Sequence, residues 1–165
     1  MLVYLVRHGI AVDREDPDCP PDAERYLTKD GVKKARMVME GLKDLGAKPS
    51  VILSSPLLRA LQTAEIAAKA LHFEKDKIRK TDALLPEADP AMLTRELSRI
   101  HVEQVLCTGH APHMDEFISL ATGTRRSFTA LKKAGVACVE FEKVAPGAGV
   151  LTALFSPRVF RRLSE

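Results

Sequence analysis

Leu5-Val6-Arg7-His8-Gly9 ends the first apolar stretch of the chain. Residues 1–6 have no charged side chain and are rich in Val, Leu and Tyr, which is typical of a strand buried on both faces. The glycine lets the backbone turn sharply, and α/β sheets bind their ligands at the carboxyl ends of strands. The sequence therefore predicts that Arg7 and His8 lie at the floor of an active site.

Apolar stretches alternate with helical patterns along the rest of the chain. Helix starts are predicted where Thr28 caps a helix that ends near Gly46, where Ser55 precedes Pro56, and where Asp89 precedes Pro90. A further helix is expected from Pro112 to about Gly123. Strands are predicted at 51–53 and 104–108, with a short edge strand and its exit at 78–85, followed by an alternating stretch at 136–142 and an apolar one at 150–155.

This alternation predicts a three-layer α/β/α sandwich with a mostly parallel sheet and a C-terminal antiparallel hairpin. The length suits a single domain spanning residues 1–165. Right-handed crossovers would bring the loops after the first, second and fourth strands to one edge of the sheet. The side chains that we expect to converge there are Arg7, His8, Arg59 and His110.

Arg59 is placed unusually for a helical residue. It falls within the first turn or so of the second predicted helix, where the helix dipole is positive and a cation is unfavourable. An anion bound nearby would remove that conflict. The position of Arg59 thus favours an anion site at the start of this helix.

Composition narrows the class of protein. Hydrophobic residues make up 45% and charged residues 28%, no apolar stretch is as long as a membrane span, and the N-terminus lacks the pattern of a signal peptide. We therefore expect a cytoplasmic protein with no membrane partner. The net charge is +3, but the basic residues are scattered and only 5% of residues are aromatic, so no nucleic-acid partner is expected. The three cysteines form no CxxC pair, which disfavours a zinc site and a disulfide framework.

An acidic segment follows the first strand. Residues 10–24 carry six acidic side chains and one arginine, and three prolines prevent a regular helix. A loop of this length in a compact domain is often functional. Two interpretations stay open: a solvated loop, or a rim of the site that helps to select the partner.

Three further strings accompany Arg7-His8-Gly9: Arg25-Tyr26-Leu27-Thr28-Lys29-Asp30-Gly31, Ser55-Pro56-Leu57-Leu58-Arg59-Ala60-Leu61-Gln62-Thr63-Ala64 and Thr108-Gly109-His110-Ala111-Pro112. Together they resemble the histidine phosphatase, or phosphoglycerate mutase-like, superfamily. The short chain and the Arg25 string look most like its SixA-type phosphohistidine phosphatases. The resemblance implies a phosphatase in which His8 is the nucleophile and forms a phosphohistidine intermediate, with Arg7, Arg59 and His110 as the phosphate pocket and no metal or other cofactor.

That assignment agrees with the chemistry of phosphoryl transfer. A phosphoryl group in transfer spreads its negative charge over three equatorial oxygens, which suit planar, permanently charged guanidiniums. The nucleophilic imidazole must be neutral, so we expect the other ring nitrogen of His8 to donate to a backbone carbonyl.

The sequence gives weaker support for a functional role of several other residues. Arg25 is a candidate substrate ligand, with packing or a surface ion pair equally open, and Glu87 is a candidate proton donor near the leaving group. His110 and His113 have a spacing that a metal could use, but no third ligand accompanies them in a recognised arrangement, so no metal is expected.

The sequence also departs from the mutase and monoesterase branches. Ile10-Ala11-Val12 stand where those branches show a Glu and then an Asn, and the insertions that cover the pocket of sugar-phosphate enzymes are missing. We therefore expect an open pocket that acts on phosphohistidine of a partner protein, such as a phosphotransfer domain in signal transduction. The alternatives are a phosphomonoesterase acting on a small phosphate ester, and a non-catalytic phosphoprotein-binding module.

Overall fold

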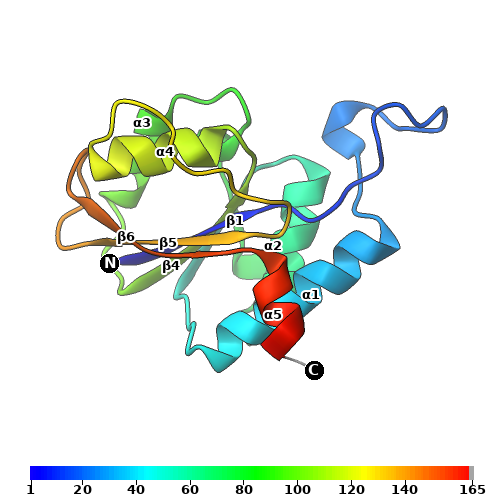
Figure 1. Cartoon of the computed structure of the whole chain (residues 1–165), viewed down its shortest axis with the longest axis horizontal. Coiled ribbons are helices and arrows are strands. Elements are labelled where there is room, and N and C mark those ends of the chain that lie inside the picture. Colours follow the sequence, from blue (N-terminus) through cyan, green and yellow to red (C-terminus); the bar gives the residue numbers. More distant parts are fainter. Residues whose placement is uncertain (164–165) are drawn as a thin grey trace.

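A mixed sheet of six strands forms the centre of the protein, in the order β3-β2-β4-β1-β5-β6 (Figure 1). The computed structural model describes residues 1–163. The strands are β1 (Leu2–Arg7), β2 (Val51–Ser54), β3 (Arg79–Lys80), β4 (Gln104–Gly109), β5 (Val136–Phe141) and β6 (Gly149–Phe155). β1, β2, β3 and β4 run parallel to one another, whereas β5 is antiparallel to β1 and β6 is antiparallel to β5. The prediction of a mostly parallel sheet with a C-terminal antiparallel hairpin is confirmed.

Helices cover both faces of this sheet. Figure 1 shows α3 and α4 on one side and α1, α2 and α5 on the other. The helices are α1 (Lys29–Asp44), α2 (Leu58–Ala70), α3 (Pro90–Leu97), α4 (His113–Thr122) and α5 (Pro157–Leu163), with short 3-10 turns η1 (Asp22–Glu24), η2 (Lys75–Lys77) and η3 (Asp82–Leu84). Within residues 1–163, no helix has the length and apolar character needed to cross a membrane.

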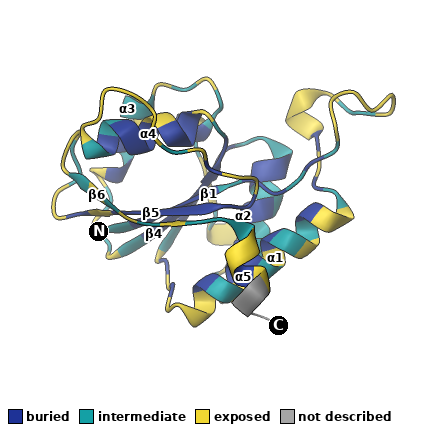
Figure 2. Cartoon of the chain, viewed as in Figure 1, coloured by how far each residue is buried: buried dark blue, intermediate teal, exposed yellow. Residues whose placement is uncertain are grey.

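The core lies in two layers, one on each face of the sheet. Val3 and Leu5 of β1 pack in the cluster that includes α3 and α4, whereas Tyr4 and Val6 pack in the cluster that includes α1, α2 and α5. Successive residues of a strand point to opposite faces, so an apolar run such as β1 suits a sheet covered on both sides. Figure 2 shows the resulting buried interior. The predicted three-layer sandwich is confirmed.

Two predicted helix starts are confirmed and one is wrong. The Thr28 side chain accepts a hydrogen bond from the Gly31 N–H, and the Asp89 side chain accepts one from the Ala91 N–H. The helix expected from Pro56, however, begins at Leu58. The hydroxyl of Ser55 accepts from the Leu57 N–H at 3.3 Å and also contacts His110, so this serine forms a turn before the helix.

The alternating pattern expected at 136–142 is also corrected. Residues 136–139 of β5 are all buried, because β5 lies between β1 and β6 with helices on both faces of the sheet. Alternation occurs instead on β6, the edge strand, where Val150, Thr152 and Leu154 are exposed.

Strand register brings the ends of three strands together. Arg7 lies opposite Gly109, and Ser54 lies opposite Thr108. The residues that follow therefore leave the sheet side by side: the His8 N–H donates to the Gly109 carbonyl at 2.9 Å, and the Ser55 N–H donates to the Thr108 carbonyl at 3.0 Å. The loops after the first, second and fourth strands meet at one edge, as the topology predicts.

Candidate active site

His8 is buried at the end of β1, with a fixed ring orientation. Its Nδ1 lies 2.7 Å from the carbonyl oxygen of Gly9, which can only accept, so Nδ1 carries the hydrogen. Burial is the main cause that lowers the pKa of His8 to about 4, and the charges of Arg59 and Arg7 lower it further. At neutral pH the ring is therefore uncharged and its lone pair is on Nε2, which is the state that a nucleophilic imidazole needs.

His110 lies next to His8, with ring centroids 5.1 Å apart. Its Nε2 is 2.9 Å from the hydroxyl oxygen of Ser55, which already accepts from the Leu57 N–H. Burial lowers the pKa of His110 to about 3, so this ring is also neutral. The Ser55 hydroxyl hydrogen has no other acceptor among the described residues, so we assign it to Nε2; His110 then carries its own hydrogen on Nδ1 and offers it as a donor.

Both arginines are anchored through their terminal nitrogens. Arg7 Nη1 donates to the Leu131 carbonyl at 2.9 Å. Arg59, the second residue of α2, donates from Nη1 to the Asp22 carbonyl at 2.7 Å and from Nη2 to the Asp22 carboxylate at 3.2 Å. Its side chain is only 2% exposed. A buried guanidinium anchored at one end has a defined orientation toward a ligand.

Three donors in this cluster are left without a partner. In the described part of the chain, three buried nitrogens of the cluster have no hydrogen-bond partner: Arg7 Nε, Arg59 Nε and His110 Nδ1. Each unpaired buried donor costs about 1–3 kcal/mol, and native proteins contain few of them. An oxyanion that accepts from all three would remove this penalty. The three donors therefore fit a phosphoryl group, whereas the helix-dipole conflict at Arg59 is already relieved by the Asp22 carboxylate.

The nucleophile candidate and α2 are also connected directly. The Gly9 N–H donates to the Thr63 hydroxyl at 3.1 Å, and that hydroxyl donates to the Arg59 carbonyl at 2.7 Å. This chain of hydrogen bonds links the turn after β1 to the first turns of α2. It fixes the relative positions of His8 and Arg59.

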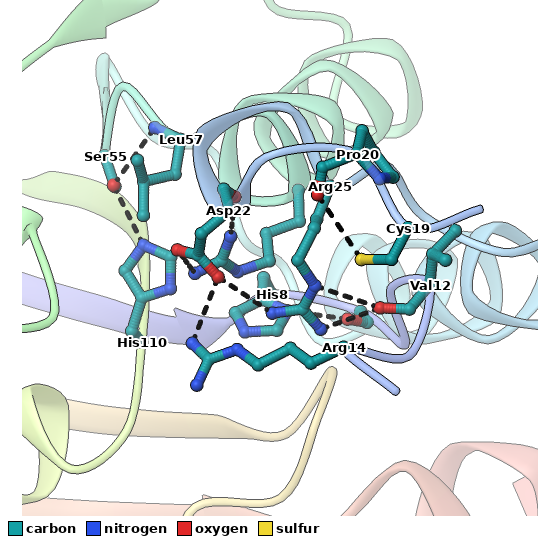
Figure 3. Close-up of polar contacts among 12 residues, drawn as sticks. His8, Val12, Arg14, Cys19, Pro20, Asp22, Arg25, Ser55, Leu57 and His110 are labelled. Atoms are coloured by element: carbon teal, nitrogen blue, oxygen red, sulfur yellow. Dashed lines mark hydrogen bonds and ion pairs between the residues drawn. The ribbon is translucent and has the colours of Figure 1, made fainter. Parts of the chain in front are cut away.

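The acidic segment reaches the same site through Asp22. The Asp22 carboxylate contacts Arg14 and Arg25 at 3.1 Å each (Figure 3). These contacts are in addition to its contact with Arg59. Burial raises the pKa of Asp22, but the hydrogen bond from Arg25 and the charge of Arg59 outweigh it and lower the pKa to about 2. Residues of the segment and Arg25 line an open pocket of about 400 Å³, which none of the four clustered residues lines. It is the contact of Asp22 with Arg59 that makes the segment part of the rim of the site, and a role of this rim in selecting a partner stays a prediction.

Arg25 and Glu87 are less directly placed. Arg25 donates to the Val12 carbonyl from Nε and Nη2, at 3.0 and 2.7 Å, and to Asp22 from Nη1. It is thus fixed at the rim by contacts within the protein, and substrate binding by it stays a prediction. Glu87 is exposed after η3 and, among residues 1–163, forms no hydrogen bond or ion pair with the four clustered residues.

His113 is fully buried at the start of α4, with both ring nitrogens unpartnered among the described residues. Burial lowers its pKa. Over residues 1–163, no three His, Cys, Asp or Glu side chains gather as a possible metal site.

Sequence reasoning missed the residues that hold the cluster in place. The pattern around Ser55 predicts a helix cap, Asp22 is one of six acidic residues in a loop, and Leu131 contacts Arg7 through its backbone carbonyl. Lys133 was missed as well: its charge helps to lower the pKa of His8, and the next amide, of Ala134, donates to the carbonyls of Arg7 and His8. The only signal in the sequence for any of them is the proximity of Ser55 to Arg59 and of Asp22 to Arg25.

Comparison with known proteins gives matches in sequence and in structure. The family model of the histidine phosphatase superfamily (branch 1) matches residues 3–88. An uncharacterized protein of Picosynechococcus sp. is 35% identical over 140 residues, which cover 82% of each chain. The mitochondrial serine/threonine-protein phosphatase Pgam5 of Drosophila yakuba is 37% identical over 46% of this chain and 25% of the relative.

Two solved structures illustrate the structural match. The protein histidine phosphatase SixA in complex with tungstate superposes with a TM-score of 0.85 at 25% identity, covering 96% of this chain and 99% of that one. A phosphoserine phosphatase variant from Entamoeba histolytica in complex with phosphoserine has a TM-score of 0.73 at 17% identity, over 95% and 98% of the two chains, and at that identity shows the fold alone.

Proposed function

The chain belongs to branch 1 of the histidine phosphatase superfamily and is a phosphatase of the SixA type; on that premise, we propose that it removes the phosphoryl group from phosphohistidine on a partner protein. In this proposal His8 is the nucleophile, and Arg7, Arg59 and His110 bind the phosphoryl oxygens. The partner is a phosphotransfer domain or a similar phosphorylated protein of a signalling relay.

One observation carries the proposal: a neutral imidazole with its lone pair on Nε2 lies beside three unpartnered buried donors. His8 is held in that state by the Gly9 carbonyl, and the donors come from Arg7, Arg59 and His110. Guanidinium and imidazole N–H groups complement the oxygens of a transferring phosphoryl group, and the anion would remove the penalty of the unpaired donors. No other group of side chains in the described residues combines these features.

The reaction proceeds in two steps. Nε2 of His8 bonds to phosphorus while the bond from phosphorus to the substrate imidazole nitrogen breaks, and that nitrogen takes up a proton from water. Water then attacks the phosphorus of phosphorylated His8, the bond to Nε2 breaks, and inorganic phosphate leaves. The guanidiniums stabilise the charge on the equatorial oxygens in both steps.

Two features support a protein-borne phosphohistidine over a small ester. The match to SixA, a protein histidine phosphatase, has a higher TM-score and identity than the match to the phosphoserine phosphatase, although both cover this chain to nearly the same extent. Expelling imidazole, whose conjugate acid has a pKa of about 6.5, needs little help from a proton donor, whereas expelling an alkoxide needs a general acid. Glu87, the candidate acid, is exposed and forms no hydrogen bond or ion pair with the four clustered residues in the part of the chain that is described.

The test compares the hydrolysis of a phosphohistidine-carrying phosphotransfer domain with that of an alkyl phosphate, using the wild type, His8→Ala and His101→Ala. His101 is an exposed histidine after α3 and serves as the matched control. We expect kcat/KM to favour the phosphohistidine protein, His8→Ala to abolish turnover, and His101→Ala to retain it. A preference for the alkyl phosphate would indicate a small-molecule phosphomonoesterase. Full activity of His8→Ala would overturn the mechanism, and tight phosphoprotein binding without turnover by the wild type would indicate a non-catalytic binding module.

We also propose that the protein acts in the cytoplasm. All three cysteines are free thiols, and Cys107 and Cys138 are buried in the core, which suits a reducing compartment. Fractionation of cells that express the tagged full-length chain tests this: recovery in the cytosolic fraction is expected, and recovery in an oxidising compartment would contradict it.

A further inference from the structure

Asp22 is the contact between the acidic segment and the buried arginine of the site. It lies at the start of η1 and gives Arg59 two acceptors, its backbone carbonyl at 2.7 Å and its carboxylate at 3.2 Å. Arg59 belongs to α2, so this contact joins residues 37 positions apart in the chain. The other acidic side chains of the segment have no such contact with Arg59 among the described residues.

Asp22 binds one edge of the Arg59 guanidinium, and the choice of edge determines whether Asp22 and a ligand can bind Arg59 at the same time. A guanidinium has five N–H donors in a planar fork, and an oxyanion can bind either across Nη1 and Nη2 or across Nε and one Nη. Asp22 binds both Nη1 and Nη2 of Arg59, whereas Nε is buried and has no partner. The edge that contains Nε is left for a ligand. Asp22 and a phosphoryl group therefore bind different edges of Arg59 rather than the same one.

Asp22 is itself held in place from the solvent side. Arg25 and Arg14 each contact its Oδ1 at 3.1 Å, while Oδ2 contacts Arg59, so both carboxylate oxygens are used (Figure 3). Arg25 is in turn fixed by two hydrogen bonds to the Val12 carbonyl. A carboxylate bound this way stays ionised at neutral pH and acts as a fixed negative charge rather than as a proton donor.

We propose that Asp22 is a positioning residue for catalysis: it holds the Nη1–Nη2 edge of Arg59 so that the Nε edge faces the phosphoryl group. This inference rests on the proposed function, because it takes Arg59 as a ligand of the phosphoryl oxygens. It gives the acidic segment a defined role in the reaction. It also separates Asp22 from the other acidic residues of that segment.

The test is a double-mutant cycle between Asp22→Asn and Arg59→Ala, measured as kcat/KM for a small aryl phosphate and as affinity for tungstate. Asp18→Asn is the matched control, since it removes the same charge from the same segment and the Asp18 side chain does not contact Arg59. Arg59→Lys serves as a second background, because Arg59→Ala removes a large buried side chain. Thermal unfolding of each variant verifies folding.

If Asp22 acts through Arg59, Asp22→Asn lowers kcat/KM by about tenfold in the wild type, the loss expected for a charge-assisted hydrogen bond, but by less than about twofold when Arg59 is replaced. Asp18→Asn leaves kcat/KM unchanged both in the wild type and in the Arg59 variants. An equal effect of Asp22→Asn with and without Arg59 would overturn the proposal. Tighter tungstate binding together with faster turnover in Asp22→Asn would also overturn it, because Asp22 would then compete with the ligand.

These probes do not depend on the physiological substrate. If the protein hydrolysed no phosphohistidine but the cycle on the aryl phosphate showed coupling, the proposed substrate would fail while the role of Asp22 stood. If phosphohistidine were hydrolysed and the cycle showed no coupling, the proposed substrate would stand while the role of Asp22 failed.

Discussion

His8 should stay neutral far below the pH at which an ordinary histidine becomes charged. Burial and the neighbouring arginines lower its pKa from 6.5 to about 4. If the pH is lowered from 7 to 5, a ring with a pKa near 4 stays about 90% neutral, whereas one with the ordinary value is only about 3% neutral. The fraction of competent nucleophile therefore differs by about thirtyfold between the two cases at pH 5.

The assay is an NMR titration of the histidine ring C–H signals between about pH 3.5 and pH 8, a range chosen to bracket both values. The chain has five histidines, and the signal lost in His8→Ala identifies His8. The same signal in the urea-unfolded chain is the internal control and should titrate near the ordinary value. A midpoint at or above 6.5 in the folded protein would refute the argument that burial keeps this ring neutral.

The lowered pKa also predicts how stability depends on pH. Between pH 6.5 and pH 4 the unfolded chain binds a proton at His8 that the folded chain does not bind, so the free energy of unfolding falls as the pH falls through this range. The full shift corresponds to about 3 kcal/mol. Urea unfolding of the wild type and of His8→Ala measures this, and the variant should lose less stability on acidification. An identical pH dependence in both proteins would contradict the assignment.

Four further predictions follow from the site. Arg59→Ala should weaken tungstate binding and slow turnover together, because Arg59 offers a buried donor to the anion; a slower reaction with unchanged tungstate affinity would oppose this role. Ser55→Ala should reduce tungstate affinity by about tenfold in a calorimetric titration, since His110 would lose the hydroxyl that keeps its hydrogen on Nδ1, and unchanged affinity would count against that tautomer. Glu87→Gln should change phosphohistidine hydrolysis by less than about tenfold in steady-state assays, and a loss of a hundredfold or more would identify Glu87 as a proton donor. Activity should survive strong chelators such as EDTA, and restoration by zinc after inactivation would require a metal at His110 and His113.

The sequence predicts the parts of the fold that depend on local patterns. β1 has no charged side chain before Arg7, its last residue, and the caps at Thr28 and Asp89 are set by residues within three positions of each other. The start of α2 was predicted two residues early because the Ser55 hydroxyl is shared between a local turn and His110, which is 55 residues away. Contacts of that range leave no trace in local spacing.

The same distinction applies to the site. Arg7, His8, Arg59 and His110 follow strand ends or begin a helix, so topology alone brings them together. The groups that orient them do not stand at such positions. Asp22 lies in a segment whose six acidic residues the composition does not distinguish, and the Leu131 carbonyl is a backbone atom that any residue would supply. Sequence spacing locates the reactive side chains, whereas the contacts that fix their donors appear only in the fold.

The two imidazoles of the site are chemically the same, and their neighbours give them opposite roles. Burial lowers the pKa of both rings, so both are neutral at neutral pH. A neutral ring has one donor and one acceptor nitrogen, and its fixed contact decides which of them is free. The Gly9 carbonyl can only accept, so it leaves His8 with a free lone pair; the Ser55 hydroxyl can donate, so it leaves His110 with a free N–H. In the proposed reaction one ring therefore attacks phosphorus while the other stabilises its oxygens.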